Sequence, residues 1–200
     1  MSRMIRIDLP VSEKEIRKLT VGDAVSLHGV IVTARDAAHK LFVEQWPEFV
    51  APLLAGGAIY HCGPVMIRDG KLWKAIAAGP TTSIREEPYE AAVMEHYGVR
   101  VIIGKGGMGP ATLAACKKVG AVYVHAIGGA APLIADTIIR TREVHLLEEL
   151  GVPEALWVYE VAGFKGVVTM DAAGRSLHDD LYAETKVNRD RLLGLAPGPA

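Results

Sequence analysis

Two hydrophobic periods alternate along the chain and predict strands and helices in turn. Stretches rich in β-branched and other apolar residues predict strands at residues 24–33, 58–61, 65–68, 72–78, 99–103, 121–126, 156–161 and 167–170. Apolar residues at helical spacing predict helices at residues 12–19, 35–44, 86–97, 110–119 and 130–139. Ser12, with Glu15 three residues later, forms the capping-box pattern that begins the first of these helices.

The middle of the chain repeats a strand, a glycine-rich turn and a helix. Residues 99–119 form one such unit and residues 121–139 form the next. Consecutive units of this kind place their strands in parallel, with a right-handed crossover. A turn at residues 68–71 instead predicts an antiparallel hairpin, and the Pro/Gly-punctuated residues 47–57 predict an irregular connection. We therefore expect an α/β fold with a mixed sheet.

Composition limits both the number of domains and the classes of partner. The chain has 200 residues, of which 50% are hydrophobic and 22% charged, and this suits one core, so we expect a single domain over residues 1–200 with a disordered tail after about residue 195. The net charge is −1 and no basic run exceeds two residues, which argues against nucleic acid and anionic membranes as partners. No apolar run approaches the roughly 20 residues of a membrane span, and we expect a cytoplasmic protein.

The cysteines and histidines do not form a recognisable metal or disulfide pattern. Cys62 and Cys116 lack CxxC spacing and predict two buried free thiols. The seven histidines are scattered without HExxH spacing, so we expect no metal ligated by this chain. His39 follows Arg35 by about one helical turn and is a candidate to reach the same cleft, although a packed or capping role is the alternative.

Three loops lie where a predicted strand leads into a helix. They are residues 34–36, 79–85 and 104–109, and each carries one cation, namely Arg35, Arg85 and Lys105. Ligands of α/β sheets gather at such positions, and arginine binds carboxylates with a planar fork, so the loops suit a small dianion. The alternatives are a solvated loop lysine, a local Arg35–Asp36 ion pair, and a weaker phosphate-binding role for the glycine loop, which lacks both nucleotide-binding motifs.

These loops occur together, in order, in one known family. Residues 33–40 (TARDAAHK), 79–85 (GPTTSIR) and 104–110 (GKGGMGP) resemble the beta chain, or C-terminal region, of the class I iron–sulfur fumarate hydratases and L-tartrate dehydratases. The likeness runs from about Leu9 to Tyr182 and includes residues 128–131 and 148–157. It implies a swivelling β/β/α domain.

The resemblance also implies a cofactor and a partner. Family members use a 4Fe-4S cluster whose three cysteine ligands lie in the alpha part, so the cluster is expected on an alpha subunit of the same hydro-lyase. The two cysteines here agree with that division, since one chain cannot supply three ligands. The expected assembly is a hetero-oligomer that acts on a C4 dicarboxylate.

By motif position, the resemblance assigns roles to individual residues. Thr81 is the candidate catalytic base, and the nearby cations are expected to stabilise its oxyanion. Arg35, Arg85 and Lys105 would bind the substrate carboxylates, and we assign Lys105 to the catalytic set together with Thr81. The other candidate substrate-binding residues are Thr82, Ser83, Gly106, Gly107 and His39.

The sequence leaves open which substrate the protein uses and whether the domain is catalytic. Reversible hydration of fumarate to L-malate is favoured by the likeness of residues 154–181 to two-subunit fumarases, and tartrate dehydration is the alternative. Ile84 and Glu86 depart from the residues that many relatives carry at these positions, but neither departure removes a cation or the threonine. A hypothesis of another class is a non-catalytic domain that binds an anion or serves only in assembly.

Overall fold

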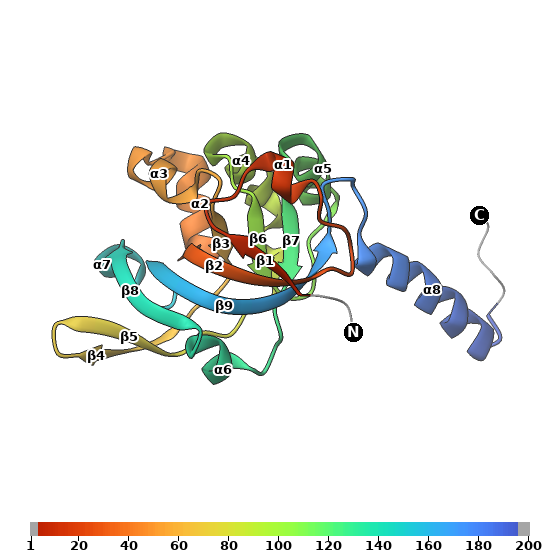
Figure 1. The fold of residues 1–200 in the computed structure, drawn as a ribbon. Helices are drawn as coiled ribbons and strands as arrows, with labels where there is room; N and C mark the ends of the chain where they lie inside the picture. Colours follow the sequence, from red (N-terminus) through yellow and green to blue (C-terminus); the bar gives the residue numbers. More distant parts are fainter. Residues whose placement is uncertain (1–3, 196–200) are drawn as a thin grey trace.

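Two long strands, β2 (Ala24–Thr33) and β9 (Leu156–Met170), form the frame of the structure (Figure 1). The computed structural model describes residues 4–195. One edge of β2 pairs in parallel with β1 (Ile5–Asp8) and then with β3 (Ala58–Tyr60). The other edge pairs with β9 in antiparallel orientation. Both edges of β2 are therefore occupied along most of its length.

The remaining strand pairs close this sheet on itself. β3 pairs in parallel with β6 (Val101–Gly104), and β6 pairs in parallel with β7 (Val122–His125). β7 then pairs antiparallel with the end of β9. Because β9 bonds to both β7 and β2, these strands form a closed barrel. The predicted mixed sheet and the parallel strands of the two βα units are confirmed.

Side-chain alternation along the barrel strands creates two cores. Ala58 and Tyr60 point into the barrel, whereas Ile59 between them belongs to the core beneath the helices. Ile103 and Ile102 divide in the same way on β6. Strands that are covered on both faces have no polar face, and this explains their continuous apolar runs.

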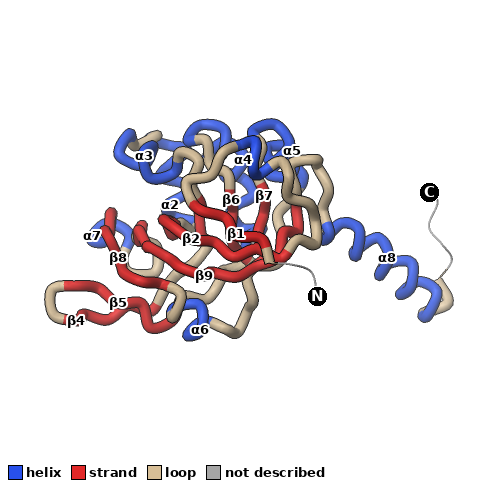
Figure 2. Tube along the Cα trace, in the orientation of Figure 1, coloured by secondary structure: helices blue, strands red, loops and turns tan. Residues whose placement is uncertain are grey.

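The outer core is covered by helices that lie along one side of the sheet (Figures 1 and 2). Residues of α2 (Asp36–Gln45), α3 (Ala51–Leu54), α4 (Glu87–Tyr97) and α5 (Pro110–Val119) supply its buried side chains. The prediction for α5 is confirmed, because proline begins the helix and Gly120 ends it at φ +70°. The short α1 (Glu13–Ile16) has the predicted cap, in which the Ser12 hydroxyl accepts from the Glu15 N–H.

Prediction and structure differ most after β7. The helix predicted over residues 130–139 is only α6 (Ala131–Ala135), and β8 (Ile138–His145) follows it, so the prediction was wrong beyond residue 135. β8 pairs antiparallel with the first part of β9. Its β-branched residues favour a strand. Because β9 offers an edge for pairing, these residues form a strand rather than the end of a helix.

β9 itself was predicted as two strands, and this was also wrong. The strand runs unbroken through Gly163, at φ +78°, beside a register shift in its pairing with β2. The hairpin of β4 (Val65–Asp69) and β5 (Leu72–Ala77) is confirmed and turns at Gly70, φ +61°.

Several short elements and one long helix were not predicted. β1 pairs with β2, and the predicted irregular connection at residues 47–57 contains the 3₁₀ turn η1 (Glu48–Val50) and α3. α7 (Leu147–Leu150) precedes β9. α8 (Leu177–Leu192) buries none of its residues and extends away from the barrel (Figures 1 and 2). The predicted disordered tail lies outside the described residues, and within residues 4–195 no helix is long and apolar enough to cross a membrane.

Candidate functional site

The carboxyl ends of four parallel strands meet at one edge of the barrel. Backbone hydrogen bonds join the residues that follow them: Ala34 N–H donates to Tyr60 O at 3.1 Å, and His61 N–H donates to Ile103 O at 2.8 Å. Ala126 N–H, after β7, donates to the carbonyl of Gly104 at 2.8 Å. The loops after β2, β3, β6 and β7 are therefore neighbours, as ligand sites in such sheets require.

The loop that carries Thr81 is inserted into this edge. Thr81 N–H donates to His61 O at 2.7 Å, and Thr81 O accepts from the Lys105 N–H at 3.3 Å. Ser83 N–H donates to Lys105 O at 3.0 Å, which completes a short parallel bridge between Thr82 and Lys105. The structure thus brings Thr81, Thr82 and Lys105 together from loops more than 20 residues apart.

The two arginines are linked to each other through Asp36. The Arg85 guanidinium binds Asp36 with two bonds, Nε to Oδ1 at 3.0 Å and Nη2 to Oδ2 at 2.6 Å. Arg35 lies 4.0 Å from the same carboxylate, so the local ion pair considered for Arg35 is the weaker of the two contacts. Arg35 instead pairs with Glu154 at 3.4 Å, and its Nη1 donates to Pro153 O at 3.5 Å.

Lys105 differs from the two arginines because its charge is not matched. No ion pair or side-chain hydrogen bond within residues 4–195 involves Lys105 Nζ or Thr81 Oγ1. Both side chains are partly exposed. Each is therefore available to a ligand at the strand ends.

The glycines after Lys105 allow a tight turn next to this lysine. Gly106 and Gly107 have φ values of +86° and +80°, in the left-handed region that glycine adopts without strain. Gly106 is exposed, whereas Gly107 is packed against the ring of His178. Of the two, only Gly106 offers its backbone to a ligand.

Two predicted substrate-binding residues lie beneath the loops rather than at their surface. His39 is fully buried on α2. Ser83 begins the 3₁₀ turn η2 (Ser83–Glu86) and is also fully buried. Its Oγ accepts from the Tyr123 hydroxyl at 2.8 Å and lies 2.9 Å from His61 Nδ1. Neither side chain is exposed, whereas those of Lys105 and Thr81 are partly exposed.

Sequence reasoning missed the polar residues that pack below the site. They are His61, Glu86, Glu90 and Tyr123, and all are buried. A signal existed for the two glutamates, since they share the buried stripe of η2 and α4 with Val93, Met94 and Tyr97. A carboxylate at an apolar position of a helix indicates a buried partner.

Glu86 is the least satisfied of these groups. Both its carboxylate oxygens are buried without a hydrogen-bond partner within the described residues. Burial raises the pKa of Glu86 to about 7 from its ordinary 4.5. The folded protein therefore holds a proton on Glu86 between these two pH values, where the unfolded chain has lost it.

Glu86→Gln is expected to raise stability at pH 8 and to change it little at pH 5. Above pH 7 the folded protein must hold a charged Glu86 carboxylate in its interior. The rise in the pKa of Glu86 from 4.5 to about 7 corresponds to a loss of about 3 kcal/mol at most in the free energy of unfolding, and glutamine avoids this loss. The free energy of unfolding in urea at both pH values measures the effect, with the exposed Glu48→Gln as the control. An equal gain at pH 5 and pH 8 would contradict a buried neutral carboxyl.

Both cysteines are buried free thiols, as predicted. Cys62 belongs to the barrel core and Cys116, on α5, to the core beneath the helices. Burial raises the pKa of each thiol to about 12. Two protonated thiols in separate cores do not form a ligand set for an iron–sulfur cluster.

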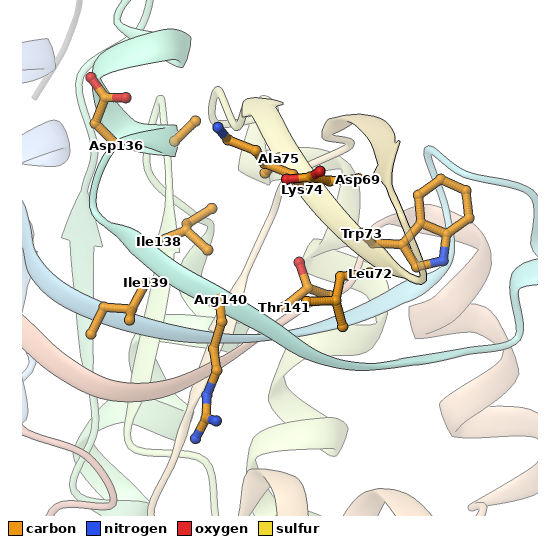
Figure 3. Close-up of a pocket in the computed structure, with 11 residues that line it drawn as sticks. Asp69, Leu72, Trp73, Lys74, Ala75, Asp136, Ile138, Ile139, Arg140 and Thr141 are labelled. Atoms are coloured by element: carbon orange, nitrogen blue, oxygen red, sulfur yellow. The ribbon is translucent and has the colours of Figure 1, made fainter.

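A separate cavity of about 410 Å³ lies between β5, β8 and α6 (Figure 3). Its charged lining residues have both signs and include Asp136, Lys74 and Arg140. None of the predicted site residues lines it. The cavity is thus distinct from the strand ends that carry the cations.

Comparison with known proteins identifies relatives along most of the chain. Residues 1–181 match the family model described as Fumarase C-terminus. A putative fumarate hydratase class I from Geobacillus stearothermophilus is 51% identical over 181 residues, which are 90% of this chain and 34% of that protein. The L(+)-tartrate dehydratase subunit beta of Escherichia coli K12 is 38% identical over 184 residues, 88% of this chain and 89% of that subunit.

A third relative is the putative L(+)-tartrate dehydratase subunit beta of Methanocaldococcus jannaschii, 37% identical over 188 residues. The match covers 92% of this chain and 96% of that protein. The chain thus spans about a third of the Geobacillus relative (34%) but most of both beta subunits. This chain therefore belongs to the Fumarase C-terminus family of hydro-lyases, with relatives among class I fumarate hydratases and L-tartrate dehydratase beta subunits.

Proposed function

We propose that this chain is the beta subunit of an iron–sulfur hydro-lyase that reversibly hydrates fumarate to L-malate together with an alpha subunit. One observation carries the proposal: Thr81 and Lys105, joined by backbone hydrogen bonds, lie at the same edge of the barrel as the Arg35 loop. Membership of this family supports hydro-lyase chemistry at these residues. The name of the two beta-subunit relatives supports a hetero-oligomer.

The cations have different tasks in this proposal. Lys105, whose charge is unmatched within the described chain, binds one substrate carboxylate as a point charge. Arg85, with a side chain that is 55% exposed, exchanges Asp36 for the second carboxylate. Arg35 is 20% exposed and is held by Glu154, so it supplies positive potential and orients the loop.

Thr81 is the proposed base. Its hydroxyl oxygen makes no hydrogen bond within the described chain, and Lys105 is its neighbour across the backbone bridge. A nearby cation lowers the cost of the threonine oxyanion. In the dehydration direction this oxyanion takes the carbon-bound proton of malate, and the hydroxyl on the adjacent carbon leaves as hydroxide. A partner-held 4Fe-4S cluster would supply a Lewis acid for that hydroxide.

The full chain on its own is expected to bind no stoichiometric 4Fe-4S cluster. Cys62 and Cys116 are buried in separate cores, and no third cysteine exists in the sequence. Anaerobic reconstitution followed by visible absorption and iron and sulfide analysis provides the measurement. A stable chromophore with two irons per chain, one 4Fe-4S cluster for each pair of chains, would show instead that four cysteines are shared between two copies of this chain.

Anaerobic co-expression with a candidate alpha subunit tests the function directly. The purified complex is assayed with L-malate, fumarate and both tartrate isomers. Higher identity to the fumarate hydratase, 51% against 38%, supports fumarate and malate as the preferred pair. Preferred turnover of a tartrate isomer would make the chain a tartrate dehydratase beta subunit.

A non-catalytic anion-binding or assembly domain is the second candidate. It is favoured by the ion pairs that Arg35 and Arg85 already make with carboxylates of this chain. The same assay separates the two candidates. A complex that assembles, carries its cluster and turns over none of the four acids would support the assembly role.

A further inference from the structure

A fully buried cluster of His39, Glu90 and His61 lies beneath the candidate site. Nε2 of His39 and Nε2 of His61 each lie 2.9 Å from the same oxygen, Oε2 of Glu90. All three side chains have an exposure of 0%. They come from α2, the end of β3 and α4, so the cluster joins three separate elements.

The partners of His39 define where its protons lie. Nδ1 of His39 is 3.0 Å from the carbonyl oxygen of Arg35, which can only accept, so Nδ1 carries a proton. Nε2 donates to the Glu90 carboxylate. With both ring nitrogens donating, His39 is an imidazolium, paired with Glu90 in the interior.

The charges around His39 agree with this assignment. Desolvation opposes the charge of His39, but Glu90, which faces it from α4, and the Arg35 carbonyl outweigh this effect, so the pKa of His39 is raised. Glu86 faces it from η2 and adds to this only where its carboxyl is ionised. The histidines hold the pKa of Glu90 below its usual value. Desolvation lowers the pKa of His61, which faces Glu90, the charged His39 and, at longer range, Asp36.

His61 continues the hydrogen bonds toward the Thr81 loop. Its Nε2–H donates to Glu90, which leaves Nδ1 of the neutral ring to accept from the Ser83 hydroxyl at 2.9 Å. Ser83 Oγ then accepts from Tyr123. Every bond direction from the Tyr123 hydroxyl to the Arg35 carbonyl is therefore determined.

The donor atoms of His39, His61 and Glu90 lie within 4.8 Å of one another, a spacing that a metal ion could also use. Nδ1 of His39 and both nitrogens of His61 already have partners at 2.9–3.0 Å. A metal ion would displace the two protons that bridge to Glu90 Oε2. The contacts thus favour a protonated network.

We propose that His39, Glu90 and His61 are positioning residues, whose hydrogen bonds hold the Arg35 loop and the Thr81 loop at a set separation. The bonds end at the carbonyl of Arg35 and at the hydroxyl of Ser83, two residues from both Thr81 and Arg85. Ser83 Oγ packs directly against Gly104, where a Cβ would overlap it, so the Ser83 loop cannot move closer to β6. The effect on turnover rests on the proposed function, whereas the hydrogen-bond directions do not.

Ser83→Ala and His39→Gln in the assembled enzyme test the positioning role. Misplacement of reacting groups by about 1 Å can cost 10²-fold in rate, so we expect kcat to fall by roughly 10- to 100-fold while KM changes little. Thr137→Val, which removes a distant hydroxyl bonded to Ile134 O, is the control and is expected to retain kcat. Wild-type kcat in a folded Ser83→Ala enzyme would overturn the proposal, and this variant remains informative if His39→Gln does not fold.

Histidine ¹⁵N NMR of the full chain tests the bond directions without any activity. At pH 7 His39 is expected to show two protonated ring nitrogens, and His61 a neutral ring protonated at Nε2. In Ser83→Ala the Nδ1 signal of His61 is expected to shift, because it loses its donor. A neutral His39 at pH 7 would overturn the network even if the enzyme proved active, and a failed assay would leave this result unaffected.

Discussion

Thr81→Val in the assembled enzyme is expected to lower kcat by about 10²- to 10⁴-fold, with little change in KM, because it deletes the group that takes the proton. Valine has nearly the shape of threonine, and the Thr81 backbone keeps its bonds to His61 and Lys105. Steady-state kinetics with L-malate measures the effect. Stability is expected to be retained, since the Thr81 hydroxyl makes no hydrogen bond within the described chain.

Thr82→Val provides the matched control for this prediction. Thr82 is exposed in the same loop and precedes η2 without a side-chain capping bond, so it is available only to bind substrate. Its loss is expected to act mainly through KM. A Thr81→Val enzyme that melts early but retains the normal kcat would remove Thr81 from the chemistry and would indicate a base on the alpha subunit.

Lys105→Met is expected to lower kcat/KM by roughly 30- to 5,000-fold, the equivalent of about 2–5 kcal/mol for removing one partner of a desolvated charge pair. Methionine keeps the apolar stem of the side chain and deletes only the charge. Since Lys105 Nζ has no partner within the described residues, the melting temperature is expected to change little. Kinetics and thermal melting of the same Lys105→Met preparation distinguish a loss of substrate binding from a loss of stability.

Lys117→Met, on the exposed end of α5, is the control for loss of a lysine charge and is expected to retain kcat/KM. Arg35→Ala provides a second comparison, because it also removes the contacts to Glu154 and Pro153 and should lower both activity and stability. Wild-type kinetics for Lys105→Met would support the alternative of a solvated loop lysine.

Local sequence signals determined the elements whose conformation depends on near neighbours. β2 and α5 follow from β-branched residues and from the proline and glycine that delimit the helix. β8 and the unbroken β9 did not follow, because their pairing partners lie elsewhere in the chain. An apolar run of about ten residues suits a helix or a strand, and only the available sheet edge decides between them.

The candidate site likewise has features that the local sequence predicts and features that depend on tertiary contacts. The three cation-bearing loops were predicted because parallel strands end at a common edge, and Arg35, Thr81 and Lys105 each belong to a short motif that the sequence shows by itself. The Arg85–Asp36 pair and the His39–Glu90 pair join residues 49 and 51 positions apart. Which buried polar groups meet depends on strand register and on how helices pack over the closed barrel, and these are tertiary properties. The sequence thus determined which residues reach the strand ends, and the tertiary structure alone decided which of their side chains are exposed there and which are buried beneath them.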